Sequence, residues 1–274
     1  MIKHHVEITI ITVNFNTSEF IKLMLFALKA LTKNQFKVII CDNGSNANQL
    51  LTLIKTVQQY DNIELLFRQQ STSGSIAHAE ALDILIKKVQ TKYTVIMDSD
   101  CTFLLNYWDE FLIKQINETT KIIGSSSPLK RKGKRIGGGD FPLPFAVFFE
   151  TCIYKKLNIS CMPGDFSKGQ DTCWEWRSKF TNNGYKGKVF ITHNTRDFKY
   201  GPFEDLTGIE EYYLKPEMLI ASHFGRGATG GGAKYFKNFK IPFFSKYLKK
   251  LYGRYERNKW IKKCYEIINK NSIK

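Results

Sequence analysis

The N-terminal part of the chain alternates short apolar runs with longer segments whose apolar residues recur at helical spacing. The runs are residues 8–13, 37–41, 63–67 and 93–97. Short apolar runs joined by amphipathic helices are the pattern of parallel strands that are covered by helices. We therefore expect an α/β fold whose strands end at one common edge of the sheet, where open α/β sheets bind ligands.

The connecting segments and the later part of the chain predict further elements. Helices are expected from Thr17 or Ser18 onward, around residues 50–57 and over about 75–89, because apolar residues there follow helical spacing. After Asp100 the pattern is less regular. It predicts helices at 106–118 and 170–183, strands at 121–125, 145–150, 188–192 and 218–222, and a basic, glycine-rich loop at 130–139.

Polar side chains follow three of the predicted parallel strands. Asn14 and Asp42 follow the first two, and Asp98-Ser99-Asp100 follows the run 93–97, so both carboxylates should leave a strand end into solvent. Two carboxylates at this spacing suit Mn²⁺ or Mg²⁺, which prefer oxygen ligands and keep places for water and substrate phosphates. Taken alone, such a tripeptide is more often a solvated turn in which one Asp caps the next helix.

The order of these segments resembles the family 2 glycosyltransferases of the GT-A fold. The resemblance covers about residues 7–225 and is strongest up to residue 101. It implies a Rossmann-like, mixed, mostly parallel sheet flanked by helices, and a metal-dependent enzyme that moves a sugar from a nucleotide sugar to an acceptor hydroxyl. It rests on Thr12-Val13-Asn14-Phe15-Asn16, Cys41-Asp42-Asn43-Gly44-Ser45, residues 74–81 and Asp98-Ser99-Asp100, in that order.

The resemblance implies roles on the donor side of the site. Thr12, Asn14 and Asp42 are expected near the nucleoside of the donor. The donor is expected to be a UDP-sugar, because UDP-sugars are frequent donors in the family. Asp98 is expected on the ribose or metal side, and Asp100 is expected to bind the metal directly.

Three later features extend the expected donor site. His78 stands near the position where the family often has Asn, and it is expected either to contact the donor or to be a packed, hydrogen-bonded residue. His223 follows a predicted strand, and the similarity implies that it joins the metal ligands. Arg226 lies nearby in a glycine-rich stretch and is expected to neutralise the leaving diphosphate.

The segment Gln170-Asp171-Thr172 resembles the acidic motif, usually Glu-Asp, that supplies the general base in inverting members of the family. Here Gln replaces the first acid, so one carboxylate remains. An inverting transfer needs a base that deprotonates the acceptor hydroxyl as it attacks the anomeric carbon. Asp171 is the candidate and Asp165 the reserve. The other interpretation of Asp171 is the N-cap of a helix over 172–183.

We expect a nucleotide-sugar-binding half at 1–101, an acceptor-binding and catalytic half at 102–233, and a helical, basic, aromatic extension at 234–274. The chain carries a formal net charge of +16, and the extension alone holds 13 Lys and Arg against two Glu. Basic helices that also carry aromatic residues bind anionic membranes, which suits a lipid-linked or surface-glycan acceptor. In a simpler interpretation, these aromatic residues pack on the domain.

The same composition suits nucleic acid, through phosphate neutralisation and base stacking. Residues 130–135 add five cations, so transfer to hydroxylated bases in DNA is the second hypothesis. A third, from another class, is a non-catalytic basic binding module. Asp98, Asp100, Asp171 and His223 favour an enzyme over this module, since a binding module does not need acidic metal ligands.

The cell compartment is predicted from what the sequence lacks. It contains neither a signal-peptide pattern nor an apolar run of about 18 residues. Its six cysteines lack the paired spacing of a zinc site and suit free thiols in a reducing compartment. We therefore expect a cytoplasmic protein that attaches, if at all, to the inner membrane face as a peripheral protein.

Overall fold

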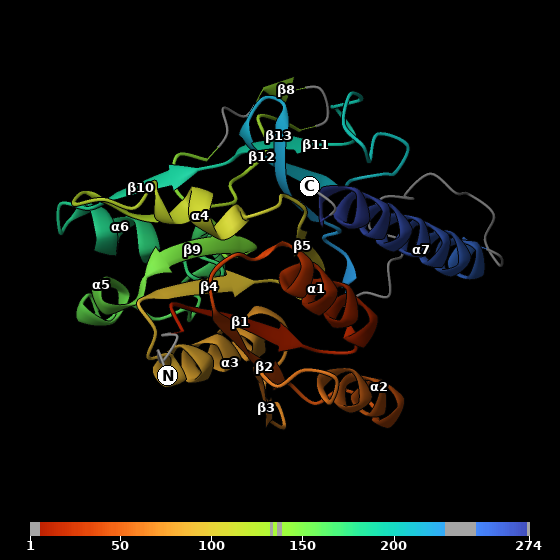
Figure 1. The fold of residues 1–274 in the computed structure, drawn as a ribbon, viewed down its shortest axis with the longest axis horizontal. Helices are drawn as coiled ribbons and strands as arrows, with labels where there is room; N and C mark the ends of the chain where they lie inside the picture. Colours follow the sequence, from red (N-terminus) through yellow and green to blue (C-terminus); the bar gives the residue numbers. More distant parts are fainter. Residues whose placement is uncertain (1–5, 132–133, 136–138, 228–244, 273–274) are drawn as a thin grey trace.

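A computed structural model of the chain describes residues 6–131, 134–135, 139–227 and 245–272. Its centre is a seven-stranded sheet in the order β10-β6-β9-β4-β1-β2-β3 (Figure 1). The strand β9 runs antiparallel to both of its neighbours, and the other pairs are parallel, so the predicted mixed, mostly parallel sheet is confirmed. The strands are β1 (Ile8–Asn14), β2 (Phe36–Asp42), β3 (Ile63–Phe67), β4 (Tyr93–Met97), β6 (Thr120–Gly124), β9 (Ala146–Glu150) and β10 (Lys186–Val189).

Helices cover both faces of this sheet. On one face α1 (Ser18–Leu31) packs on the strands, and α2 (Ala47–Val57) and α7 (Ser245–Ser272) pack on α1. On the other face lie α3 (Gly74–Lys88), α5 (Thr151–Lys156) and α6 (Trp176–Thr181). Alternate residues of β1 enter the two cores, Ile10 on the α1 side and Ile11 on the α3 side. Burial on both faces explains why a central strand such as β1 is rich in apolar residues along its whole length.

A second, four-stranded antiparallel sheet follows the order β11-β12-β13-β5. It consists of β5 (Cys101–Phe103), β11 (Ile191–Asn194), β12 (Glu210–Lys215) and β13 (Met218–His223). The sequence analysis missed β5 and β12. In the pairing of β5 with β13, Cys101 lies opposite His223, so this short strand brings the end of β13 beside the turn that follows β4.

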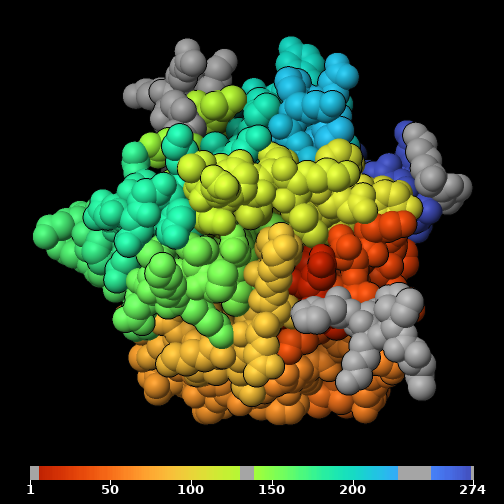
Figure 2. Space-filling model, turned by 60° about the vertical axis from the view of Figure 1, so that its left-hand side comes forward, coloured from red at the N-terminus to blue at the C-terminus, as the bar shows by residue number. Residues whose placement is uncertain are grey.

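The helix α4 (Trp108–Ile113) lies between the N-terminal elements and the second sheet, as the yellow band in Figure 2 shows. The Trp108 ring stacks on Phe103 with 3.8 Å between the ring centroids. The buried carboxylate of Asp109 accepts hydrogen bonds from the backbone N–H groups of Lys33 and Asn34, at 3.0 and 2.7 Å. This helix therefore joins the loop after α1 to the strand that leads to the second sheet.

Two predicted helices are shorter in the structure than the periodicity indicated. The first, expected at 106–118, ends near Ile113, and Asn117 then accepts hydrogen bonds from the N–H groups of Thr119 and Thr120 in a turn. The second, expected at 170–183, begins only at Trp176. Cys173 has a φ of 63°, a left-handed conformation that a right-handed helix cannot contain.

Two small features complete the description. A 3₁₀ turn, η1 (Phe166–Lys168), precedes α6, and a hairpin of β7 (Lys130–Arg131) and β8 (Lys134–Arg135) lies within the predicted basic loop. The rest of that loop at 132–133 and 136–138 is outside the described residues, as is the expected boundary between residues 233 and 234. The division of the chain into functional segments remains a prediction.

The predicted C-terminal helix is present as α7, and side chains spaced four apart attach it to the domain. Glu256, Trp260, Cys264 and Ile268 are fully buried. The Trp260 indole N–H donates to the Ser222 hydroxyl at 3.0 Å. In the described part of the chain, no helix combines the length and the apolarity that a bilayer span requires.

A buried ion pair joins α7 to the segment after β13. Glu256 Oε2 lies 2.7 Å from an Arg226 guanidinium nitrogen, and neither side chain is more than 1% exposed. Glu256 Oε1 also accepts a hydrogen bond from the Thr207 N–H at 2.8 Å. The carboxylate therefore holds two separate segments against the helix.

Replacing Glu256 with Ala leaves the Arg226 charge buried without this partner, so we expect the free energy of unfolding to fall by about 3–5 kcal/mol. The matched control is Glu266→Ala on the same helix. Glu266 is 62% exposed and lies 3.9 Å from Lys262, so its loss should cost less than about 1 kcal/mol. Urea unfolding of both variants measures the difference, and similar losses in both would contradict it.

Candidate functional site

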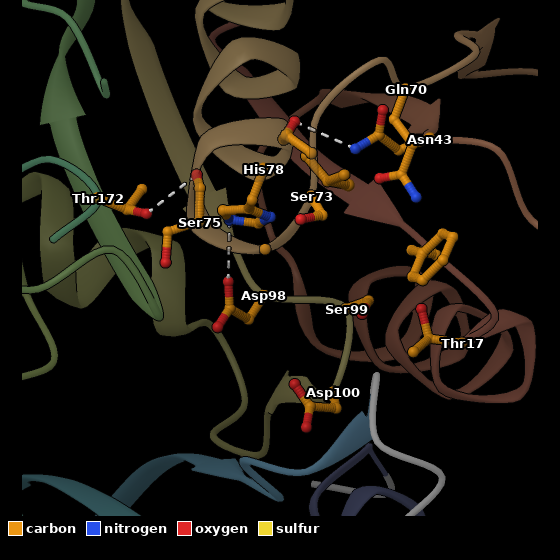
Figure 3. Close-up of a pocket in the computed structure, with 14 residues that line it drawn as sticks. Thr17, Asn43, Gln70, Ser73, Ser75, His78, Asp98, Ser99, Asp100 and Thr172 are labelled. Carbon is orange, nitrogen blue, oxygen red and sulfur yellow. Dashed lines mark hydrogen bonds and ion pairs between the residues drawn. The ribbon is translucent and has the colours of Figure 1, made fainter. Parts of the chain in front are cut away.

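A cavity of about 480 Å³ lies at the carboxyl edge of the first sheet. Its walls come from the loops after β1, β2 and β4, from the first turn of α3 and from Thr172 (Figure 3). Asn43 and Gln70 stand at one end of the cavity in Figure 3, and Asp98 and Asp100 stand at the other. Parallel sheets bind ligands at this edge, so the position agrees with the sequence-based expectation.

Asp98, Asp100 and His223 form a three-residue cluster beside the cavity, as the sequence analysis predicted. One ligand atom from each residue lies within 4.8 Å of the others. The Nε2 atom of His223 lies 3.2 Å from an oxygen of Asp100 and 3.6 Å from an oxygen of Asp98. Two carboxylates and an imidazole are a donor set that binds Mn²⁺ well. The residues therefore fit a divalent cation.

Asp100 is enclosed, whereas the sequence analysis expected its carboxylate to face solvent. Its side chain is 9% exposed, because the turn after β13 folds over it. The N–H groups of Arg226 and Gly227 donate to one carboxylate oxygen at 2.8 and 2.7 Å. Any Cβ at position 227 would lie only 2.8 Å from the Cβ of Asp100, so the turn needs glycine there. One oxygen of Asp100 is thus fixed by the backbone, while the other faces His223.

The protonation of the cluster follows from burial and from mutual charge. Burial alone would lower the pKa of His223, but Asp100, Glu210 and Asp98 raise it well above its ordinary value. Burial raises the pKa of Asp98 to about 7, with further contributions from Asp100 and Glu210 against the opposing effect of His223. The pKa of Asp100 is lowered, since His223 and the two N–H groups outweigh its burial. At neutral pH His223 is therefore an imidazolium that offsets the carboxylates.

Two residues on β12 that the sequence analysis missed hold the second nitrogen of His223. His223 Nδ1 lies 3.7 Å from Glu210 Oε2 and 3.3 Å from the Tyr212 hydroxyl, which donates to the same carboxylate at 2.8 Å. A carboxylate beside the outer nitrogen orients a ligating histidine and selects its tautomer. The sequence could have indicated these two residues through the run Glu210-Glu211-Tyr212-Tyr213. Alternate residues of a strand share one face, so Glu210 and Tyr212 are expected side by side.

His78 lines the cavity opposite Asp98, with its Nε2 atom 3.6 Å from the nearer carboxylate oxygen (Figure 3). Burial lowers the pKa of His78 to about 4, although Asp100 and Asp171 oppose this shift. The ring is thus neutral at pH 7, and its N–H can donate to a polar ligand in the cavity. The location fits the expected donor contact, which remains a prediction.

Asp171 does not cap a helix, because α6 begins only at Trp176. Thr172 lines the cavity, and its hydroxyl donates to the Ser75 carbonyl at 3.4 Å. Partial burial raises the pKa of Asp171, but hydrogen bonds from the Ser75 hydroxyl and the Thr172 N–H hold it below its ordinary value. Asp171 is therefore an ionised carboxylate next to the first turn of α3. The reserve candidate Asp165 instead accepts hydrogen bonds from Ser167 within its own exposed turn.

Three residues predicted to contact the nucleoside do not line this cavity. Thr12 is fully buried in β1, on the face that packs against α1. Asn14 donates to Asp42 at 2.7 Å, and Asp42 also accepts from the Ser45 N–H at 3.1 Å, so both side chains hold the turn after β2. In the structure Asn14 and Asp42 stabilise this turn. Their roles in nucleoside binding remain predictions.

Asn43, the neighbour of Asp42, lines the cavity instead. Its side chain donates to the Ala77 carbonyl at 3.1 Å and accepts from Arg68 at 2.6 Å. These contacts fix it against α3. Asn43 and Asp42 lie in the same turn of the sequence. The sequence analysis chose Asp42 as the nucleoside contact because the family resemblance points to the carboxylate.

Arg226 reaches the cluster through its backbone and not through its guanidinium. The side chain points to Glu256 on α7, and its guanidinium carbon lies 4.4 Å from the centroid of the Phe224 ring. In this arrangement the guanidinium does not line the cavity. The predicted contact with a leaving diphosphate therefore lacks support from the geometry.

Comparison with known proteins identifies the family. Residues 9–167 match the family model Glycosyl transferase family 2. A teichoic acid poly(glycerol phosphate) polymerase from Staphylococcus epidermidis is 27% identical over 117 residues, which make up 43% of this chain and 16% of the polymerase.

Two solved structures share the fold. The mannosyltransferase PcManGT from Pyrobaculum calidifontis, solved in complex with GDP-Man and Mn²⁺, has a TM-score of 0.54 and 13% identity, over 69% of this chain and 56% of that one. TarS from S. aureus has a TM-score of 0.50 and 14% identity, over 68% of this chain and 35% of TarS. The chain spans less than two thirds of the length of each of these relatives. Since the family model matches more than half of the chain, and these structures share its fold, the protein belongs to glycosyl transferase family 2 and has the GT-A fold.

Proposed function

We propose that this protein transfers a sugar from a nucleotide sugar to an acceptor hydroxyl. The observation that carries the proposal is the cluster of Asp98, Asp100 and His223 at one end of a cavity of about 480 Å³. That volume lies within the range of small-ligand sites. The PcManGT structure holds both GDP-Man and Mn²⁺, which supports a nucleotide sugar together with a divalent cation here.

In the proposed mechanism Asp98, Asp100 and His223 would hold a divalent cation when one is bound. Such a cation neutralises the charge that develops on the leaving diphosphate. The backbone N–H groups of Arg226 and Gly227 keep Asp100 ionised and oriented. Neutral His78 donates to a polar group of the donor, and Asn43 marks the nucleoside end of the cavity.

Asp171 is the proposed general base. Its ionised carboxylate takes the proton of the acceptor hydroxyl as that oxygen attacks the anomeric carbon, on the face opposite the diphosphate. The new bond forms as the bond to the diphosphate breaks, so the configuration at the anomeric carbon inverts. UDP is the expected nucleotide, and GDP is the alternative that the PcManGT complex supports.

The proposed acceptor is a surface glycan or a lipid-linked glycan at an anionic membrane. The match to a teichoic acid polymerase supports an acceptor of the cell surface. Transfer to hydroxylated bases in DNA is the second candidate, because residues 130–135 carry five cations, four of them in the hairpin of β7 and β8. A cytoplasmic location would suit either acceptor, and peripheral attachment to the inner membrane face would suit the lipid-linked one.

The Asp100→Asn variant tests the enzyme proposal against the non-catalytic module. Losing one of three charged or ligating groups should weaken Mn²⁺-dependent binding of UDP by at least about 100-fold, since hard cations depend on ionised oxygen ligands. Calorimetry with UDP and MnCl₂ measures the affinity, and GDP is titrated in parallel. The exposed Asp61→Asn variant serves as a control and should bind normally. The proposal would be falsified if UDP and GDP bound equally well with and without MnCl₂ and if Asp100→Asn bound them as tightly as the wild type.

The affinity for Mn²⁺ should rise with pH. A cation on His223 Nε2 must displace a proton from a group whose pKa is well above its ordinary value, and Asp98 also holds a proton below its pKa of about 7. The association constant should therefore increase about tenfold per pH unit for each proton released. The increase should be steeper below pH 7, where both groups release protons.

Titrations at pH 6, 7 and 8, each with calorimetry in buffers of different ionisation enthalpy, measure this dependence. In His223→Gln the affinity should be lower overall, and the increase above pH 7 should disappear. An affinity that stays constant between pH 6 and 8 would contradict the assignment of His223 as a ligand.

Replacing Asp171 with Asn should lower kcat by about 10²- to 10⁴-fold, the usual contribution of a general base. Donor hydrolysis, in which water takes the place of the acceptor, provides the assay after a screen of nucleotide sugars. Affinity for UDP and Mn²⁺ should be unchanged. Asp165→Asn makes the same charge change in the same loop and should retain activity. The opposite result, with only Asp165→Asn inactive, would move the base to the reserve candidate.

A further inference from the structure

The first described turns of α7 carry an exposed apolar row. Leu248, Leu251, Tyr252 and Tyr255 are 37%, 42%, 38% and 57% exposed. They stand at positions i, i+3, i+4 and i+7, so they form one continuous stripe along the helix. We call these four residues the α7 stripe. An apolar row of this length facing water is the usual sign of an interaction surface.

Leu248, Leu251 and Tyr255 of the stripe face away from the domain, whereas the Tyr252 side chain contacts Thr207 and Glu256. The residues that attach α7 are Glu256, Trp260, Cys264 and Ile268, which form a separate buried row. Successive residues of a helix are about 100° apart, so the two rows lie on nearly opposite sides of α7. The contacts that hold the helix on the domain therefore leave the stripe exposed.

The charges beside the stripe differ from those farther along the helix. Lys259 and Lys263 pair with Asp205, and Arg257 pairs with Glu19. Lys249, Lys250 and Arg254 lie within the stripe's own turns and form no ion pair with the described residues. Cations without an ion-pair partner among the described residues, next to exposed Leu and Tyr, are complementary to a surface that is apolar inside and anionic outside.

The stripe is also close to the proposed metal site. Tyr255 is adjacent to Glu256, whose carboxylate binds Arg226, and the backbone N–H of Arg226 donates to Asp100. In Figure 1 these turns of α7 project from the molecule at the end toward which β1 and β4 point. A surface that met the stripe would therefore lie at the same end of the molecule as the cavity.

We propose that the α7 stripe docks on the headgroup region of an anionic lipid bilayer, with Lys249, Lys250 and Arg254 among the lipid phosphates. Leu248, Leu251 and Tyr255 would enter the interface, and the buried row would keep the catalytic domain at a fixed distance from it. The reason for docking, which is access to a membrane acceptor, rests on the proposed function. Docking itself needs neither donor nor metal.

Vesicle co-sedimentation of the full chain tests the proposal. The protein should bind vesicles rich in phosphatidylglycerol at least about tenfold more tightly than phosphatidylcholine vesicles, and salt should weaken this binding. The double variant Leu251→Ser, Tyr255→Ser should lose at least about tenfold of the affinity for the anionic vesicles. Tyr200→Ser is the matched control, because Tyr200 is 90% exposed but lies outside α7.

Two measurements separate this inference from the proposed function. Calorimetry with UDP and Mn²⁺, without vesicles, should give the same affinity for the wild type and the double variant, which also shows that the variant is folded. Vesicle binding is measured without nucleotide or metal. If the wild type does not bind UDP and Mn²⁺, the proposed enzyme function is wrong. If it does not bind anionic vesicles, the docking proposal is wrong.

Four results would overturn the docking proposal. The wild type would not bind anionic vesicles, or the double variant would bind them as tightly as the wild type does. Alternatively, sedimentation velocity would show a dimer that the double variant abolishes, and the stripe would then be an interface between two copies. Binding to duplex DNA that depends on Leu251 and Tyr255 would likewise replace the membrane with nucleic acid.

Discussion

The site depends on keeping several carboxylates together at one edge of the sheet. Asp98, Asp100 and Glu210 surround a single imidazole, with His223 nitrogens 3.2 to 3.7 Å from their oxygens. Like charges at such distances repel strongly where water is scarce. The cluster is stable because His223 is protonated and because Asp98 takes up a proton near pH 7. A divalent cation would replace those protons with a charge of the same sign.

This arrangement requires two sheets to meet. Asp98 and Asp100 come from the turn after β4, whereas His223 and Glu210 come from β13 and β12 of the antiparallel sheet. The three residues of β5 make the connection by pairing with the end of β13. Beyond that end, the turn at residues 226 and 227 encloses Asp100, and Glu256 on α7 holds Arg226 in place. The proposed metal site therefore uses elements from almost the whole length of the chain.

The sequence alone predicted the parallel part of the fold well. Residues 63–67 and 93–97 are the observed limits of β3 and β4. Every residue of the central strand β4 is buried, which favours an apolar run, whereas the edge strand β3 has no fully buried residue and was found from its short apolar segment alone. The limits were less accurate where local hydrogen bonds end a helix. The side chain of Asn117 and the left-handed Cys173 shorten two helices, and periodicity does not detect either effect.

Site residues were predictable where a motif names them, and less so where packing decides the direction of a side chain. Asp98, Asp100 and His223 were found, and they do converge. Asn43 takes the cavity wall expected for Asp42, since Asp42 is held by Asn14 and Ser45. The guanidinium of Arg226 is turned away by Glu256, 30 residues farther along the chain. Such distant pairings are not encoded in local spacing.

The position of α7 also affects the order in which the site can form during synthesis. A ribosome releases the N-terminal residues first, and domains fold as their elements become available. The α1 surface around Phe20 packs against Trp260, so it stays uncovered until the last helix has been made. The turn over Asp100 likewise lacks Glu256 until then. A nascent chain therefore holds Asp98 and Asp100 early but completes the turn over Asp100 only once α7 has been made, and the aromatic surface of α1 is exposed in the interval.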